Sequence, residues 1–198
     1  MKSLFTTLLI ALFTLSGNVF AQSNSYNIID KSTMQIEGTS TLHDWTADVE
    51  KFSSYINFDA SALEGDTKNN PVKSLSLTIP VESIESGKGG MNRKMYGALK
   101  SDDFPNIMFQ MDNAELTTAD SSSTIELNIN GTLTVAGTSK SITLPVTGEQ
   151  QGNESYKFTG EYEINMKDYN VDPPSAMLGT IKSGEKVTIS FEFYVAQS

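Results

Sequence analysis

The sequence predicts an all-β protein, a single antiparallel barrel of about eight strands with one short helix. Apolar and polar residues alternate along most of the chain, which gives each expected strand one buried face and one solvated face. Short polar segments such as "EGDTKNN" and "EQQGNE" separate these runs and are typical of turns. No linker or change of composition divides the chain, so we expect one barrel domain.

The expected strands follow the chain in order. The first two cover roughly Thr33 to Gly38 and Trp45 to Phe58, the second interrupted near Ser53 and Ser54. The segment "VAGTSK" lies between two well-patterned runs and predicts a hairpin. Closure into a barrel would remove the exposed edges of an antiparallel sheet. The remaining strands are indicated by alternation over residues 75–81, 107–111, 125–135, 142–146, 156–166 and 187–195.

Two prolines fall within these strands. In a strand, alternate residues face opposite sides of the sheet. Pro80 and Pro145 both occupy positions that face outward, and the apolar residues on either side of each proline face inward. Proline has no N–H to donate, so within a sheet it requires an edge, a bulge or a bend. We therefore expect the strands to bend around the barrel at these two positions.

One segment, residues 87–105, breaks the β pattern. Met91, Met95 and Leu99 are spaced four residues apart, which places them on one face of a helix of about two or three turns. Several glycines weaken this helix, so we expect it to lean on the barrel. The segment also gathers basic residues without an intervening acid: Lys88, Arg93, Lys94 and Lys100.

The N-terminus is typical of an export signal. Lys2 precedes an apolar run too short for a comfortable membrane span, and Val19 and Ala21 occupy the small-residue positions of a cleavage site. We expect residues 1–21 to be a cleaved signal peptide and residues 22–198 to form the barrel domain. This predicts an exported protein, periplasmic or extracellular, with no stable membrane insertion after cleavage.

Composition excludes several classes of function. The chain has no cysteine, which rules out disulfides, thiolate metal sites and a cysteine nucleophile. Its formal net charge of −10 gives no general attraction for nucleic acid or an anionic membrane. We therefore expect no nucleic-acid partner.

The stretch "GTSTLHDWTADV" holds the only histidine, His43, and the only tryptophan, Trp45, with Asp44 between them. A zinc or redox-metal site would need further histidine or cysteine ligands, and no serine-hydrolase, phosphate-binding or dinucleotide motif is present. We expect no catalytic residue, metal or cofactor. The inward-facing residues are even-numbered before this stretch and odd-numbered after it, so a turn or bulge must lie between Thr39 and Asp44. This predicts His43 at the barrel rim and Trp45 inside.

Four stretches, taken in order, resemble the YceI-like family of polyisoprenoid-binding proteins. They are "GTSTLHDWTADVEKF", "LKSDDFPNIMF", "INGTLTVAGTSKSITLPV" and "KDYNVDPP" followed by "GTIKSGEKVTISFEF". The resemblance implies a lipocalin-like antiparallel barrel that encloses an elongated apolar ligand. It also implies an exported location, a carrier role rather than a reaction, and a possible homodimer.

The function expected from the sequence is non-catalytic binding of a long apolar lipid, a polyisoprenoid or an isoprenoid quinone, as carrier or store. Arg93 and Lys94 are expected to meet its head group at the barrel mouth. Two alternatives stay open: a filled barrel that acts through a protein-interaction surface, and an enzyme that uses His43 with a rim carboxylate. The expected ligand-binding residues are His43, Trp45, Met91, Met95, Leu99, Phe109, Met111, Tyr162 and Phe191.

Overall fold

The computed structural model describes residues 26–63, 69–118, 124–152 and 155–197, so the expected signal peptide lies outside the described residues. One α-helix, α1, spans Gly89–Leu99. Short 3-10 helices are η1 (Ala60–Leu63), η2 (Val81–Ser83), η3 (Met166–Tyr169) and η4 (Met177–Gly179). The strands are β1 (Tyr26–Ile28), β2 (Thr33–Ser40), β3 (Trp45–Val49), β4 (Ser53–Phe58), β5 (Val72–Pro80), β6 (Ile84–Glu85), β7 (Asn106–Thr118), β8 (Thr124–Val135), β9 (Thr138–Gln150), β10 (Ser155–Asn165), β11 (Ser175–Ala176) and β12 (Ile181–Gln197).

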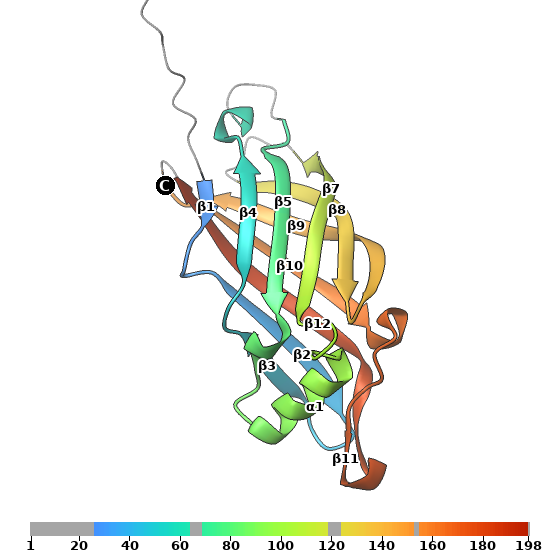
Figure 1. Ribbon diagram of the computed structural model, residues 1–198. Helices are drawn as coiled ribbons and strands as arrows, with labels where there is room; N and C mark the ends of the chain where they lie inside the picture. The colour runs from blue at the N-terminus through green and yellow to red at the C-terminus, as the bar shows by residue number, and fades with distance from the viewer. Residues whose placement is uncertain (1–25, 64–68, 119–123, 153–154, 198) are drawn as a thin grey trace, which may run out of the picture.

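These strands form one antiparallel sheet that curls round on itself (Figure 1). Its hydrogen-bonded path runs β4-β5-β7-β8-β9-β10-β12-β2-β3-β6. β3 and β4 are successive parts of one run of chain, and β5 and β6 are parts of another. β4 pairs with β5, beginning at Phe58 opposite Val72, and β3 pairs with β6, ending at Asp48 opposite Glu85. The run that contains β3 and β4 therefore lies beside the run that contains β5 and β6 along both of its parts. The ends of the path therefore meet, and the all-β single-barrel prediction with one short helix is confirmed.

The predicted count of about eight strands is wrong. Among the described residues the sheet has twelve strands, ten of them on the continuous path. One long run divides at residues 50–52, just before the expected position, and a second divides at η2. The strands β1, β6 and β11 are two or three residues long. Segments this short are too brief to show a period of two in the sequence.

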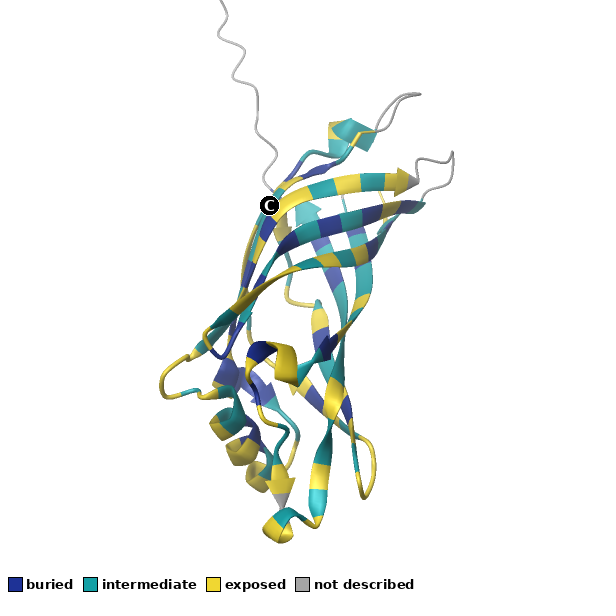
Figure 2. Ribbon diagram, turned by 90° about the vertical axis from the view of Figure 1, so that its right-hand side faces the viewer, coloured by how far each residue is buried: buried dark blue, intermediate teal, exposed yellow. Residues whose placement is uncertain are grey.

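The hairpin predicted at "VAGTSK" joins β8 to β9. Ala136 and Gly137 both have positive φ angles, 47° and 76°, as a two-residue hairpin turn with the twist of the flanking strands requires. Glycine adopts this conformation without strain. β8 itself alternates between buried and more exposed residues, a pattern that Figure 2 shows along the strands.

Pro145 marks the point where two neighbouring strands separate. β9 pairs with β10 from Gln150 opposite Tyr156 to Val146 opposite Gly160, and the pairing stops before Pro145. Proline cannot donate a ladder hydrogen bond. Beyond this point η3 follows β10, and the Asn170 side chain donates a 3.1 Å hydrogen bond to Thr138 Oγ1 at the start of β9. The wall of the barrel is thus completed there by loop contacts.

Helix α1 packs across one end of the barrel, as the apolar spacing predicted. Met95 is buried, whereas Met91 and Leu99 are half-buried. Asn92 is also buried, and its side-chain oxygen accepts a 3.0 Å hydrogen bond from the Ser86 N–H. The sequence pattern gave no sign of this polar anchor. No helix among the described residues is long and apolar enough to cross a membrane.

Candidate ligand-binding cavity

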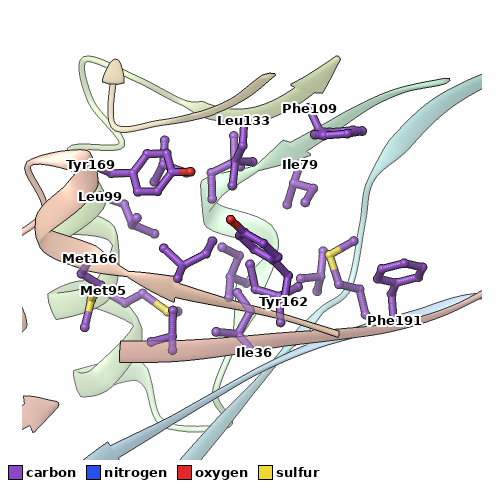
Figure 3. Close-up of a pocket in the computed structure, with 18 of the residues that line it drawn as sticks. Ile36, Ile79, Met95, Leu99, Phe109, Leu133, Tyr162, Met166, Tyr169 and Phe191 are labelled. Atoms are coloured by element: carbon purple, nitrogen blue, oxygen red, sulfur yellow. The ribbon is translucent and has the colours of Figure 1, made fainter. Parts of the chain in front are cut away.

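The barrel encloses a cavity of about 520 Å³ (Figure 3). Its walls are formed by inward-facing side chains of the long strands and by the apolar face of α1. A volume of this size lies in the range of roughly 300–1,000 Å³ that is usual for small-molecule sites. The wall residues labelled in Figure 3 include Ile36, Ile79, Met95, Leu133, Met166 and Phe191.

Aromatic rings close one end of the cavity. The Phe58 ring lies 5.1 Å from the Tyr26 ring, 4.8 Å from Tyr156 and 5.8 Å from Phe158, measured between centroids. All four side chains are buried, and Phe158 belongs to the cavity lining. Tilted and edge-to-face ring pairs at these distances stabilise each other beyond their simple burial. We call this group of four residues the aromatic end.

The opposite end of the cavity is polar. It is formed by the turn after β2, the first half of α1, and the β11 segment with the start of β12. Apart from Trp45 and two tyrosines, the polar side chains of the lining all lie here. We call this group the polar end, and it consists of Ser40, His43, Lys88, Lys94, Ser175 and Ser183.

Hydrogen bonds join the segments of the polar end. The Lys94 ammonium donates to the Ser175 carbonyl, which ties α1 to β11. The Thr41 N–H donates a 3.0 Å hydrogen bond to the Lys182 carbonyl, which ties the turn after β2 to β12. The polar end is therefore assembled from three parts of the chain that are far apart in the sequence.

The stretch around His43 is a hydrogen-bonded turn. The Ser40 hydroxyl donates to the His43 carbonyl at 2.7 Å and accepts the His43 N–H at 3.2 Å. His43 Nδ1 lies 2.7 Å from the Asp44 carbonyl oxygen, so this ring nitrogen carries the proton. Trp45 Nε1 donates to the Thr39 carbonyl at 3.0 Å. Each of these bonds has a backbone group as donor or acceptor, and among the described residues no cluster of three His, Asp or Glu side chains forms a metal site.

Glycines facing the large rings keep the cavity open. Gly38 lies opposite Trp45, and a Cβ atom on Gly38 would come within 2.3 Å of the Trp45 ring. Gly160 lies opposite Phe191 in the same way, and its Cβ would come within 2.5 Å of that ring. Each ring can therefore lie flat against the wall, where a larger residue would push it into the cavity. Gly148 lies opposite Phe158, and a Cβ atom on Gly148 would come within 2.6 Å of that ring. Gly131 lies opposite Met111, but its Cβ would come within 2.6 Å of the Phe109 ring.

Most of the residues predicted for the site come together in this cavity. His43, Trp45, Met91, Met95, Leu99, Phe109, Tyr162 and Phe191 all contribute to its lining. Met111 is buried in the packed core but is not part of the lining. Whether these side chains contact a ligand stays a prediction.

The two predicted head-group residues differ in position. Lys94 lies at the polar end, whereas Arg93 is exposed and outside the lining. The helix accounts for this difference, because Arg93 is two residues from both Met91 and Met95 and so points away from the face they share. A role for Arg93 would have to act at the outer rim.

Sequence reasoning missed the contribution of residues 167–175. The motif "KDYNVDPP" reads as a polar turn, yet Tyr169 and Val171 are both buried and line the cavity. Burial raises the pKa of the Tyr169 hydroxyl to about 12, with further contributions from Tyr162 and Asp168. The available signal was an aromatic and an aliphatic residue two positions apart inside an otherwise polar loop.

Comparison with known proteins gives this geometry a family context. The family model of the YceI-like domain matches residues 26–195. The crystal structure of BcnA from Burkholderia cenocepacia shares 22% identity, covers 85% of this chain and 99% of that chain, and has a TM-score of 0.67. The YCEI protein from Campylobacter jejuni shares 19% identity over 77% of this chain and 84% of that chain, with a TM-score of 0.60.

A polyisoprenoid binding domain from Saccharophagus degradans, implicated in plant cell wall breakdown, has the same fold. It shares 12% identity, covers 88% of this chain and 99% of that chain, and has a TM-score of 0.64. No curated protein matches the chain. At such low identities, the structural likenesses establish the shared lipocalin-like fold alone.

Proposed function

Since this chain belongs to the YceI-like domain family, we propose that its barrel binds a long apolar lipid of the isoprenoid class, as carrier or store, without transforming it. One observation carries the proposal. The barrel holds a cavity of about 520 Å³ whose wall is apolar except for two tyrosines, Trp45 and the polar end. Such a cavity suits a molecule with a long hydrocarbon part and one polar group.

The energetics favour this class of ligand. Each methylene moved from water into an apolar site contributes about 0.8 kcal/mol, so several isoprene units bind tightly without polar contacts. The aromatic end is packed with buried rings, which leaves the polar end as the natural position for entry. The lipid chain would then extend from the polar end toward the aromatic end.

The two alternatives from the sequence receive less support. A barrel filled by its own side chains would leave little space, whereas this one holds an extended apolar cavity. An enzyme would need an activated group in the site. Within the described residues, the hydrogen bonds of His43 are directed to Ser40 and to the Asp44 carbonyl, and no carboxylate bonds its ring. The family comparison likewise supports binding rather than a reaction.

The proposal includes an exported protein, periplasmic or extracellular. It rests on the N-terminal apolar run and the cleavage pattern at Val19 and Ala21, outside the described residues. N-terminal sequencing of the protein from a fractionated bacterial host tests this point. We expect a chain that begins at Gln22 in the exported fraction.

Mass spectrometry of an organic extract of the purified protein tests the proposed ligand class. We expect an isoprenoid-type lipid in near-stoichiometric amount. Delipidated protein should take up prenyl lipids, and Trp45 reports the uptake because it is the only tryptophan and lines the cavity. An empty extract, together with no fluorescence change on adding prenyl lipids, would contradict the proposal.

A further inference from the structure

Two tyrosine hydroxyls lie inside the apolar part of the cavity. Tyr162 extends from β10, and Tyr169 from η3, which follows directly (Figure 3). Tyr169 is only 4% exposed, yet neither hydroxyl forms a hydrogen bond with a described residue. Both side chains belong to the lining, so their hydroxyls face the space that a ligand would occupy.

Other tyrosine hydroxyls of this protein do have hydrogen-bond partners. The Tyr96 hydroxyl donates to the Ile84 carbonyl at 2.9 Å, and the Tyr194 hydroxyl donates to Glu192 at 2.6 Å. No fully buried side-chain nitrogen or oxygen among the described residues lacks a partner. The cavity tyrosines are consistent with this, because their hydroxyls remain accessible to the cavity itself. A hydroxyl in apolar surroundings is destabilising unless something in that space accepts its hydrogen bond.

Tyr162 lies near the middle of the barrel's length, between the two ends of the cavity. Tyr162 is opposite Ile189 on β12, whereas Ser183 of the same strand belongs to the polar end. At the other extreme, Tyr156 of the aromatic end is opposite Val195. A ligand group that reaches Tyr162 has therefore passed beyond the polar end and its lysines.

The chemistry of the pair favours an uncharged acceptor. The Tyr169 pKa of about 12 keeps its hydroxyl protonated at physiological pH. Lys88 and Lys94 are the lining residues with cationic side chains, and both lie at the polar end. A phosphate moved to the tyrosines would lose its water without gaining a cation, which is strongly unfavourable. A carbonyl oxygen loses far less and accepts the same hydrogen bonds.

We propose that Tyr162 and Tyr169 form a neutral hydrogen-bonding subsite inside the cavity for an uncharged carbonyl oxygen of the lipid, as in a prenylated quinone. This inference rests on the proposed function, because it names the head group of the same ligand. It assigns the head group to the interior of the barrel and not to the basic residues of α1. The polar end then remains as the place where water and the lysines face the entrance.

Titration calorimetry with matched ligands tests the subsite. The probes are a short-chain prenyl quinone, the hydrocarbon with the same prenyl chain, and the corresponding prenyl phosphate. For the wild type, we expect the quinone to bind more tightly than the hydrocarbon. In Tyr162→Phe/Tyr169→Phe, quinone affinity should fall about tenfold, since two neutral hydrogen bonds are lost. Hydrocarbon affinity should change by less than about twofold, because phenylalanine keeps the apolar wall.

Tyr96→Phe is the matched control, because Tyr96 is not part of the cavity lining and its hydroxyl is bonded to the backbone carbonyls of Glu82 and Ile84. It should leave quinone affinity unchanged. Each single variant, Tyr162→Phe and Tyr169→Phe, should show part of the loss. If the double variant folds badly, hydrocarbon affinity falls together with quinone affinity, and the single variants then decide the question.

The outcomes separate the two proposals. If the wild type binds quinone and hydrocarbon equally, or the variants keep the difference, the subsite is wrong while lipid binding stands. If the prenyl phosphate depends on the tyrosines as strongly as the quinone does, the preference for an uncharged group is wrong. If no prenyl compound binds at all, the proposed function itself fails.

Discussion

The two ends of the barrel are closed in different ways. The aromatic end is sealed by buried rings from β1, β4 and β10, which contact one another directly. The polar end is formed by a turn, half a helix and a short hairpin, held together by hydrogen bonds such as that from Lys94 to Ser175. In the proposed function, the aromatic end stabilises the barrel and the polar end admits the ligand.

A large stability effect is expected at the aromatic end. Phe58→Ala removes the ring that contacts Tyr26, Tyr156 and Phe158. Large-to-small changes of a buried phenylalanine cost about 3–5 kcal/mol. We expect a loss of this size in the free energy of unfolding, measured by chemical denaturation.

Met91→Ala at the polar end is the comparison, because Met91 is half-buried and lines the cavity. It should cost clearly less stability than Phe58→Ala. Equal losses from the two substitutions would contradict the division between a stabilising end and an accessible end.

The next effect is the dependence of stability on alkaline pH. Burial raises the pKa of Tyr169 from its ordinary value of 10.0 to about 12. The folded state therefore favours the neutral hydroxyl, and its contribution is fully present below pH 10 and is lost as the pH rises toward 12. The loss is on the order of 2 kcal/mol.

Unfolding of the wild type and of Tyr169→Phe across this pH range measures the effect. The variant should lose less stability than the wild type, because its side chain does not ionise. The other tyrosines titrate in both proteins, so only the difference between the two curves is informative. Parallel curves would show that Tyr169 is not held in a buried site.

Cavity volume is expected to respond to a change at Gly160. In Gly160→Val the new side chain would meet the Phe191 ring and push it into the cavity. We expect uptake of a prenyl lipid, followed by Trp45 fluorescence, to weaken by about tenfold, or about 1.4 kcal/mol of binding free energy, because the displaced ring would occupy space that the ligand needs.

Gly97→Ala is the control for this experiment. No atom lies within 4 Å of the Cβ position of Gly97, which is in helix α1. Alanine should stabilise the helix by about 0.5–1 kcal/mol and leave uptake unchanged. Unaltered uptake by Gly160→Val would show that Phe191 does not limit the space available to the ligand.

The smallest effect is expected beside the polar end. Leu178 is fully exposed and has a φ of 55°, a conformation that is unfavourable for a leucine. Leu178→Gly should raise the free energy of unfolding by about 1 kcal/mol, because glycine adopts positive φ without strain. Thermal unfolding measures the change. A lower stability would indicate that the leucine side chain makes a stabilising contact.

Regular elements were predictable from local patterns. Alternation over residues 125–135 indicates a strand with a buried face, and the structure places β8 there. The spacing of Met91, Met95 and Leu99 likewise predicts α1. These patterns are readable because each residue's environment repeats with the geometry of its own strand or helix. The short strands β1, β6 and β11 carry no such repeat.

The candidate site was only partly predictable. The parity of Trp45, Phe109, Tyr162 and Phe191 points them inward, and all four line the cavity. Met111 has the parity of Phe109 but lies in the packed core, because parity indicates the side of a strand and not the depth along the barrel. Tyr169 was missed because it ends a four-residue 3-10 helix, which is too short to show a period in the sequence.

The sequence by itself determined the fold class, the helix and the inward faces, since these depend on local periodicity. Only the tertiary structure decided which end is closed by rings and which polar groups meet at the other. It also decided that the hydroxyls of Tyr162 and Tyr169 share one apolar space. The physical reason is that barrel closure brings together residues far apart in the chain, and their contacts leave no repeating pattern in the sequence.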